Sequence, residues 1–488
     1  MYQVQGGPGT GIRAVFDRVR GLSMLLDRLA HRVKLQLSQS SSVWFVVFAV
    51  SAAFLTYFSM YAFRKPFSVG LYEDSMLWGI DLKILLILSQ VSGYMLSKFI
   101  GIKVVSEMLH DRRGIAILGL VAMAEIALVL FAILPEPMKP LAMFLNGLPL
   151  GMIWGLVFSY LEGRKTSELL GAGLSASFIV ASGAVKSVGK GLIVYLGVPE
   201  FWMPALTGLI FMPLLLVSVY ALSMVPEPDA DDIAQRQLRQ PMNAADRWHL
   251  FRQYWFGIVV LILAYILFTG LRDFRDNFSA EIWVALGYGN EPAIFSYTGA
   301  RVTAIVLGVL ALLMLVKDNF RALAANHLVI VGGCGLLGAS TWAFEQGSLD
   351  ARTWMVMVGT GLYLAYIPYG CFLFDRLVAV AGGVANAGFL IYLADSAGYV
   401  GSFALLLLKH FHLPDISWLS FFLGSIYTAA IMGGFLVLAS WCYFRLRLSG
   451  GRTPNKAVRR HERPPAARTS LSNMSPVPGV QSHSQHGR

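Results

Sequence analysis

The sequence predicts an all-α membrane protein whose twelve transmembrane helices form two pseudo-symmetric six-helix bundles. Three observations predict this fold class: the composition, the spacing of the apolar segments and an internal repeat. Of the 488 residues, 56% are apolar and 14% are charged, whereas soluble domains carry roughly 25% charged residues. A soluble enzyme of this length would lack the charged residues that its surface needs.

Twelve apolar blocks follow residue 42, and each is long enough to cross a ~30 Å hydrocarbon layer as a helix. The blocks run over 43–71, 83–105, 114–134, 140–161, 171–197, 202–225, 254–279, 293–316, 323–345, 353–374, 384–410 and 417–444. The longest polar insert divides them six and six. We therefore predict an N-terminal bundle over 43–225, a linker over 226–252 and a C-terminal bundle over 253–448.

Both ends of the chain are basic. Residues 1–42 combine apolar residues at helical spacing with arginines, which suits either an amphipathic helix on an anionic membrane surface or a solvated tail. Residues 449–488 are rich in Arg, Ser, Pro and Gln and predict a disordered tail. Lys and Arg gather in both tails and the linker, so the positive-inside rule predicts that both termini are cytoplasmic. The expected location is a bacterial inner membrane. This topology and the lipid surface account for the net charge of +11, and no nucleic-acid partner is predicted.

An internal repeat connects the two halves. The segment Phe63–Ser68 (FRKPFS) matches Phe274–Ser279 (FRDNFS), which begins 211 residues later. Two further matches keep nearly the same spacing: Glu162 with Asp375, and Ser187–Gly189 with Tyr399–Gly401. Three matches in corresponding blocks predict a parallel duplication, and transporter halves of this kind meet at a central solute site near the bilayer midplane.

Twelve ionisable residues lie inside the apolar blocks. They are Arg64, Lys65, Lys98, Glu125, Lys186, Lys190, Arg272, Asp273, Arg275, Asp276, Arg301 and Asp395. An Arg or Lys that faces lipid at a helix centre costs about 2.5–3.5 kcal/mol, so several of them together would cost as much as the stability of a whole domain. These side chains must therefore face protein, water or a ligand.

Some of these charges have a structural interpretation. Arg272 and Asp276 are four residues apart and could form a salt bridge along one helix face, and Asp273 could likewise serve a neighbour. Glu125 is interpreted as a packed or hydrogen-bonded residue. For Arg301 a structural pair and a functional role are equally open.

Asp395 has two interpretations, as a structural partner for Lys186 or Lys190 and as a group that carries a proton. The two lysines are themselves four residues apart, so this like-charge pair needs a compensating anion. Arg64 and Lys98 have no acidic residue three or four positions away.

Arg64 and Arg275 recur at equivalent positions of the two halves. Two guanidinium groups from opposite halves can bind a phosphate or carboxylate through bidentate hydrogen bonds. The predicted substrate site also includes Lys65, next to Arg64, and the nearby Tyr61 and Tyr94. Tyrosine can donate a hydrogen bond and also stack on an organic moiety.

Twelve spans in two halves with a polar middle loop resemble the major facilitator superfamily over residues 43–445. The segment Gly93–Gly101 (GYMLSKFIG), followed by Ser106 and Arg112–Gly114, is similar to its second helix and the next loop, although Ser106 replaces the usual Asp. Within the superfamily, the chain resembles the organophosphate:phosphate antiporters. Their first helix is tyrosine-rich and has Arg-Lys followed by Phe, as in Tyr61–Phe67 here, and their second helix has Ser-Lys-Phe, as in Ser97–Phe99.

This resemblance implies a major facilitator fold in which Arg64 and a helix-seven arginine, Arg275 or Arg272, hold a phosphate with help from Lys98. Lys186 stands where these antiporters have a central His, so their protonation scheme does not carry over. The strings around Arg64 and Arg275 also resemble an uncharacterised bacterial branch of the superfamily.

The sequence as a whole predicts a secondary transporter that moves an organic anion, a phosphorylated metabolite, by alternating access, in exchange for phosphate. One alternative is a proton-coupled symporter of another anionic solute, with Asp395, Asp273 or Asp276 carrying the proton. Another is a membrane solute sensor that transports nothing. An enzyme is disfavoured because no nucleotide-binding, metalloprotease or Ser/His/Asp pattern lies in a polar loop. We expect a monomer with no cofactor, and the three cysteines match no metal or disulfide pattern.

Overall fold

The computed structural model describes residues 28–30, 32–39, 41–73, 75–161, 167–227, 244–381 and 387–449. Within these residues, twelve helices are long and apolar enough to cross a membrane, as the sequence predicts. Most of the predicted tails at 1–42 and 449–488, most of the linker, and Glu162 of the repeat lie outside the described residues. Residues 28–30 and 32–39 are helical.

The N-terminal half contains helices α2 to α8 and one small hairpin. Its elements are α2 (Ser42–Met60), η1 (Tyr61–Phe63), η2 (Pro66–Val69), β1 (Met76–Leu77), β2 (Ile80–Asp81), α3 (Leu82–Glu107), α4 (His110–Ile133), η3 (Glu136–Met138), α5 (Lys139–Leu150), α6 (Ile153–Phe158), α7 (Ser167–Leu196) and α8 (Met203–Ser223). The strands β1 and β2 pair antiparallel. Asp81 caps α3, because its carboxylate accepts from the backbone N–H of Lys83 at 2.8 Å and so satisfies a free donor of the first turn.

The C-terminal half repeats this layout. Its elements are α10 (Ala244–Asn277), α11 (Ser279–Ala285), α12 (Ala293–Met314), α13 (Asn319–Glu345), α14 (Ala351–Pro368), the π-helix η4 (Tyr369–Leu373), α15 (Phe374–Ala381), α16 (Ala387–His412), α17 (Trp418–Thr428), the π-helix η5 (Ala429–Gly433) and α18 (Gly434–Ser449).

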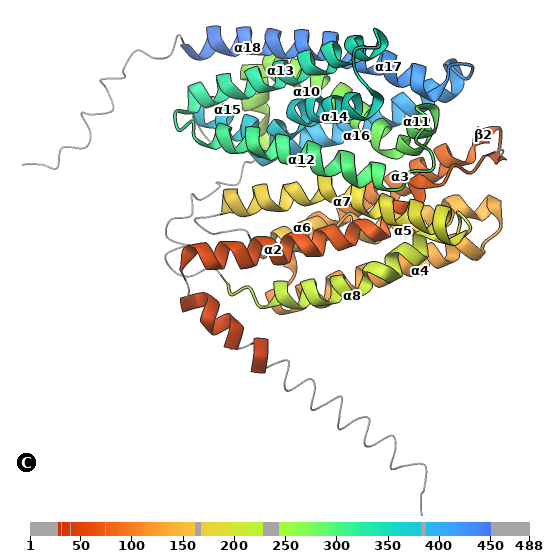
Figure 1. Cartoon of the computed structure of the whole chain (residues 1–488). Coiled ribbons are helices and arrows are strands. Elements are labelled where there is room, and N and C mark those ends of the chain that lie inside the picture. Colours follow the sequence, from red (N-terminus) through yellow and green to blue (C-terminus); the bar gives the residue numbers. More distant parts are fainter. Residues whose placement is uncertain are drawn as a thin grey trace, which may run out of the picture.

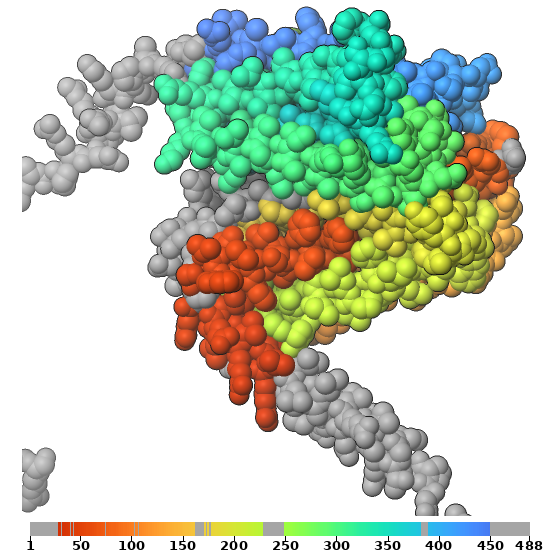
Figure 2. Space-filling view, viewed as in Figure 1, coloured from red at the N-terminus to blue at the C-terminus, as the bar shows by residue number. Residues whose placement is uncertain are grey.

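Packing within the two halves follows the same scheme. In the N-terminal half α2 packs against α7 and α8, and α3 against α5; in the C-terminal half α10 packs against α16 and α18, and α12 against α14. The two halves lie one above the other, with α7 and α12 side by side between them (Figure 1). In the space-filling view the lower half is red to yellow-green and the upper half green to blue (Figure 2). The fold is therefore two six-helix bundles, as predicted.

A glycine allows a close approach between the halves. A Cβ atom on Gly183 of α7 would lie 2.5 Å from the carbonyl oxygen of Phe295 in α12. Only a residue without a side chain permits this distance, and small residues serve this purpose at helix contacts in membranes. The backbones of α7 and α12 therefore lie close together, and the N–H of Ser296 in α12 donates to Oγ of Ser187 in α7 at 2.9 Å.

Two sequence boundaries need correction. The apolar block 43–71 is not one helix, because α2 ends at Met60 and two short 3₁₀ turns follow. Pro66 explains the break, since it lacks an N–H group and its ring clashes with the preceding helical turn. The predicted linker 226–252 is also too long, because α10 already begins at Ala244 and kinks at Tyr254.

The ends of the helices define two sides of the molecule. The first residue of α2 and the last residue of α18 lie on the same side, which we call the terminal side (Figure 1). The hairpin and α11 lie on the opposite side, which we call the far side (Figure 1).

Candidate functional site

The two copies of the repeat lie where the first and seventh spans break. Arg64 and Lys65 sit between η1 and η2, and Arg275 and Asp276 occupy the last turn of α10, before the non-helical residue Phe278 (φ −108°, ψ 21°). Broken helices are common at the solute sites of transporters, because their free backbone groups can face a cavity. The repeat found in the sequence therefore marks equivalent breaks in the structure.

Buried amides hold the first break in place. The Nδ2 group of Asn146 donates to the carbonyl of Phe63 at 3.0 Å, and Nε2 of Gln90 donates to the carbonyl of Arg64, also at 3.0 Å. Gln90 also donates to Oδ1 of Asn146 at 2.8 Å. These bonds satisfy carbonyls that the interrupted helix leaves free, and they fix the backbone that carries Arg64.

A cluster of three charges joins the two halves next to these breaks. We call Lys65, Lys186 and Asp276 the buried charge cluster. Asp276 forms an ion pair with Lys65 and another with Lys186, whose Nζ lies 2.7 Å from Oδ1 of Asp276. Lys65 also donates to Oδ1 of Asn277 at 3.1 Å, and Ser182 donates to Asp276 at 2.5 Å. One carboxylate of the C-terminal half therefore binds two lysines of the N-terminal half.

The predicted salt bridge between Arg272 and Asp276 does not form. Arg272 instead binds Asp273, with Nη2 2.7 Å and Nε 3.0 Å from Oδ1, and its guanidinium lies 4.2 Å from the ring centroid of Tyr366. Asp273 also accepts from the hydroxyl of Ser402 at 2.7 Å. The reason is that Asp276 already has two lysine partners from the other half, which the spacing along one helix cannot reveal.

A second contact between the halves lies nearer to the terminal side. Nζ of Lys98 in α3 lies 3.5 Å from Oδ2 of Asp395 in α16, and we call these two residues the terminal-side pair. Tyr265 donates to Asp395 at 2.5 Å, and Lys98 lies 4.9 Å from the ring centroid of Tyr399. Asp395 is thus not the partner of Lys186, and the interpretation that paired it with Lys186 or Lys190 is wrong.

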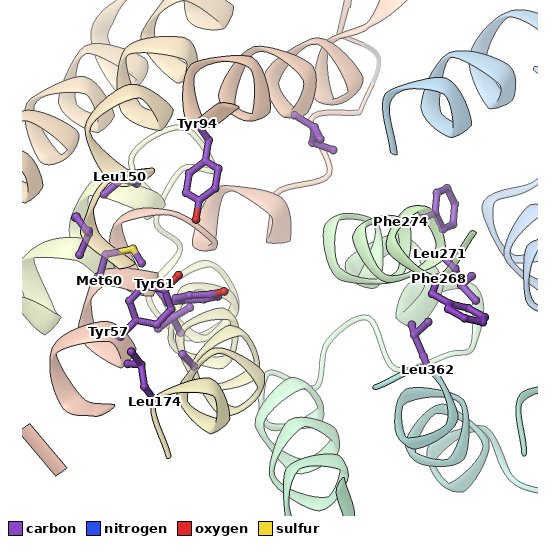
Figure 3. Packing of buried hydrophobic residues seen from close by; sticks show 14 of the residues in the cluster. Tyr57, Met60, Tyr61, Tyr94, Leu150, Leu174, Phe268, Leu271, Phe274 and Leu362 are labelled. Atoms are coloured by element: carbon purple, nitrogen blue, oxygen red, sulfur yellow. The ribbon is translucent and has the colours of Figure 1, made fainter. Parts of the chain in front are cut away.

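Arg64 lies among tyrosines. Its guanidinium carbon is 3.9 Å from the ring centroid of Tyr94 and 6.0 Å from that of Tyr61, distances typical of cation–π contacts. Tyr57 stacks edge-on against Tyr61 at 5.5 Å, and Tyr94 extends from its helix toward these two rings (Figure 3). Nε of Arg64 is buried without a hydrogen-bond partner, and among the described residues no carboxylate forms an ion pair with this arginine.

Arg275 lies at a cavity between the halves. Its Nη2 donates to the carbonyl of Met355 at 3.1 Å, while its Nε is buried and has no partner in the described part of the chain. Gly359 leaves room for the guanidinium, since a Cβ there would lie 2.7 Å from Nη2. The cavity has about 440 Å³ of empty space, including the part open to the outside, and Lys186, Asp276 and Tyr363 also line it.

The cavity wall combines charges, hydroxyls and apolar groups. Ser182, Ser279 and Thr298 supply the hydroxyls. The apolar lining is formed by Ile179, Trp283, Phe295, Val302 and Met355. A few polar groups in a mainly apolar wall are typical of sites for small organic ligands.

Each arginine has a tyrosine nearby, Tyr61 at 6.0 Å from Arg64 and Tyr363 in the wall of the cavity beside Arg275. Tyr61 is close enough to interact electrostatically with Arg64, Asp276 and Tyr363. Tyr363 in turn interacts with Arg275 and Arg272. The two arginines therefore belong to one connected polar region rather than to separate surfaces.

The charges of this region do not balance. Six cations of the predicted site lie here, namely Arg64, Lys65, Lys98, Lys186, Arg272 and Arg275, against three acids, Asp273, Asp276 and Asp395. Asp273 and Asp395 each form an ion pair with one cation, and Asp276 with two. Arg64, Arg275 and one lysine of the buried charge cluster are left uncompensated, an excess of three positive charges.

The structure places other residues differently from the sequence analysis. Arg301 is exposed, and its guanidinium lies 3.5 Å from the ring centroid of Tyr297. It forms no ion pair with a described residue, so the structural pair considered for it is not found there. Glu125 is buried, which agrees with its interpretation as a packed residue. Neither of its carboxylate oxygens has a hydrogen-bond partner among the described residues, so the alternative of a hydrogen-bonded residue does not hold there.

A third contact between the halves was not predicted from the sequence. Lys83 of α3 forms an ion pair with Glu281 of α11 and donates to the carbonyl of Ser68 at 2.9 Å. On the same side, a ring nitrogen of His410 lies 3.2 Å from the carbonyl oxygen of Gly79. Lys83 and Glu281 stand at the edges of apolar blocks, where a charge can face water and does not indicate a buried partner. Only the fold brings the two residues together.

Comparisons with known proteins agree with this architecture. The model of a family of unknown function, DUF5690, matches residues 66–447, and the chain belongs to this family. No curated protein matches the sequence significantly.

Solved structures match nearly over their whole length. A D-xylose-proton symporter is 14% identical with a TM-score of 0.54, and the match covers 83% of this chain and 98% of the symporter. The nucleoside transporter NupG is 13% identical with a TM-score of 0.53, covering 82% and 99%. A mutant of the peptide transporter POT in complex with sulfate is 14% identical with a TM-score of 0.55, covering 86% and 98%. These likenesses confirm the major facilitator fold, and the chain is a multi-pass integral membrane protein.

Proposed function

We propose that the protein is a secondary transporter that moves a small organic anion, a phosphorylated metabolite, across the membrane by alternating access. The observation that carries the proposal is the excess of three positive charges between the halves. A buried cation without a partner is costly, so a bound anion would lower the energy of this region. A phosphate monoester carries about two negative charges near neutral pH, which fits the two unpaired guanidinium groups.

The arrangement of the site supports a ligand with two chemically different parts. Arg64 and Arg275 come from opposite halves and can bind the phosphate in the bidentate geometry that arginine prefers. The cavity beside Arg275 offers hydroxyl and aromatic groups for the organic part. Exchange against inorganic phosphate follows as the simplest coupling, because both anions would use the same cations in turn.

The orientation is part of the proposal. The terminal side carries Arg112 and Arg113 at the start of α4, and the first residue of α2 and the last residue of α18 lie on the same side. We place this side in the cytoplasm of a bacterial cell, in line with the positive-inside rule. Modification of single cysteines introduced at Asn290 and at Arg112, with an impermeant reagent added to intact cells, would label Asn290 alone in this orientation.

Counterflow in proteoliposomes tests the function. Vesicles preloaded with inorganic phosphate should take up labelled glycerol phosphate or a sugar phosphate. Arg64→Ala and Arg275→Ala should each weaken binding by about 100-fold, because loss of one partner of a buried charged hydrogen bond costs at least 2–5 kcal/mol. Arg301→Ala is the matched control, since this arginine also lies in a span but is outside the site, and it should transport normally.

Ligand-induced stabilisation separates transport from binding. A phosphate ester at 100 times its dissociation constant should add about 2.7 kcal/mol to the stability of the protein. Such a stabilisation without any counterflow would indicate a sensor instead of a transporter. The anion site would be refuted if no phosphate ester, no carboxylate and no inorganic phosphate gave either stabilisation or counterflow.

A further inference from the structure

Four of the twelve charged residues predicted inside the spans are acids. Glu125 is the one of these four for which the described structure shows no partner. It lies in the middle of α4, and the whole residue is 8% exposed to solvent. Both carboxylate oxygens are buried, and neither has a hydrogen-bond partner among the described residues. An ionised carboxylate in such a place would cost far more than a neutral one, and a group so placed neutralises instead. The side chain must therefore be a carboxylic acid in this conformation.

The surroundings of Glu125 offer no opposite charge. The elements packed against α4 are α5, α8, α6 and η1. The ionisable residues on them are Lys139 at the first position of α5, Tyr220 near the end of α8 and Tyr61 of η1. Lys139 donates to the carbonyl of Phe131 at 2.7 Å, one and a half turns beyond Glu125, and Arg64 is directed toward Tyr94.

The pocket of Glu125 is adjacent to the break that carries Arg64. A Cβ atom on Gly208 of α8 would lie 2.3 Å from Oε2 of Glu125 and 2.9 Å from the ring of Phe63. The acid and this ring therefore share the space that Gly208 leaves open. Asn146 adds a second link, because its Nδ2 donates to the carbonyls of both Phe63 and Ala124 at 3.0 Å.

We propose that Glu125 is a proton-binding site that couples the conformation of the first-span break, and hence of Arg64, to proton binding. The ligand is a single proton, which Glu125 holds in the conformation described here, in which the Lys83–Glu281 ion pair joins the two halves and closes the far side. Glu125 releases it in a conformation that gives the carboxylate water or a hydrogen-bond donor. Because a ligand shifts a conformational equilibrium toward the state that binds it better, protonation favours the closed far side and deprotonation favours its opening. This function goes beyond the anion site, since it makes the cycle sensitive to pH.

Infrared spectroscopy of the purified full-length protein tests the protonation directly. At neutral pH the wild type should show a carboxylic-acid C=O band that is lost in Glu125→Gln and retained in the control Glu136→Gln, an exposed acid at the far side. Absence of the band from the wild type, or its persistence in Glu125→Gln, would overturn the assignment. The wild-type spectrum decides this even if the variant fails to fold.

Spin-label distances test the coupling without any knowledge of the substrate. Labels at Met76 and Asn290 are placed on exposed far-side residues of the two halves. The background carries His410→Gln, because this imidazole contacts Gly79 across the same side. With Glu125 present, the distance should lengthen as the pH is raised from neutral to alkaline. With Glu125→Gln, which mimics the protonated acid, the distance should stay short at every pH. An equal pH response in both proteins, or none in either, would overturn the coupling.

Discussion

The ionic contacts between the halves differ in their access to water. In the buried charge cluster the side chains of Lys186 and Asp276 are 3% and 17% exposed, whereas Lys98 and Asp395 of the terminal-side pair are both 31% exposed. The Lys83–Glu281 ion pair is likewise buried, at 2% and 12%. Charges attract more strongly away from water, but they also lose more when one partner is removed. In this conformation the far side is therefore held by dry contacts and the terminal side by a wetter one.

This difference has a consequence for alternating access. If the far side is to open, Lys65 and Lys186 must separate from Asp276, and at least one charge must find another partner. An anion bound beside Arg275 lies next to Lys186, because both residues line one cavity. The anion would then take over part of the role of Asp276. The buried charge cluster is thus the contact whose strength a substrate can change most.

The largest effect is expected from Asp276→Asn. This change leaves two buried lysines without their carboxylate, and breaking a buried pair costs about 3–5 kcal/mol. Thermal unfolding of the purified protein should show the loss. Adding Lys65→Met and Lys186→Met should restore most of the stability, because apolar side chains can replace a buried ion pair at little cost. A single variant as stable as the wild type would mean that the cluster is open to water.

The fold was predictable because it depends on properties that the sequence shows locally. The length of each apolar block sets a helix, and the six-and-six division sets the two bundles. The Phe63–Ser68 repeat lies at the two helix breaks, but the breaks themselves were not predicted, because the apolar run through 43–71 concealed that the first helix ends at Met60.

The pairing of charges was not predictable in the same way. Spacing along one helix suggested Arg272 with Asp276, but Asp276 binds two lysines of the opposite half. Arg272 instead binds the adjacent Asp273. Lys98 and Asp395 are almost 300 residues apart, and no local pattern connects them. The roles of Arg64 and Arg275 stay predictions, which the charge balance now supports with a physical reason.

An intermediate effect is expected at the close contact of α7 with α12. Gly183→Ala places a methyl group against the carbonyl oxygen of Phe295 at 2.5 Å, and overpacking of this kind typically costs about 1–3 kcal/mol. Gly308→Ala is the matched control on α12, because a Cβ there meets nothing within 4 Å and alanine favours the helix. Thermal unfolding compares the two. Equal stability of both variants would show that α7 and α12 do not approach as closely as described.

The smallest effect is expected at the terminal-side pair. A double-mutant cycle with Lys98→Met and Asp395→Asn should give a coupling energy below about 1 kcal/mol, because partly exposed ion pairs are worth little. Thermal unfolding at low and high salt provides the measurement, and the coupling should decrease as salt screens the charges.

The exchanged pair Lys98→Asp with Asp395→Lys sharpens the comparison with the buried charge cluster. If the terminal-side pair is only a weak contact between α3 and α16, the exchange should retain most of the stability and the coupling. Tyr265 limits this symmetry, because its hydroxyl donates to Asp395 at 2.5 Å and would meet an ammonium group after the exchange. Tyr265→Phe in the exchanged background removes that donor and should not cost further stability. A salt-independent coupling as large as that of Asp276 would instead show that both sides of the protein are closed by dry contacts, and the difference in water access would not hold.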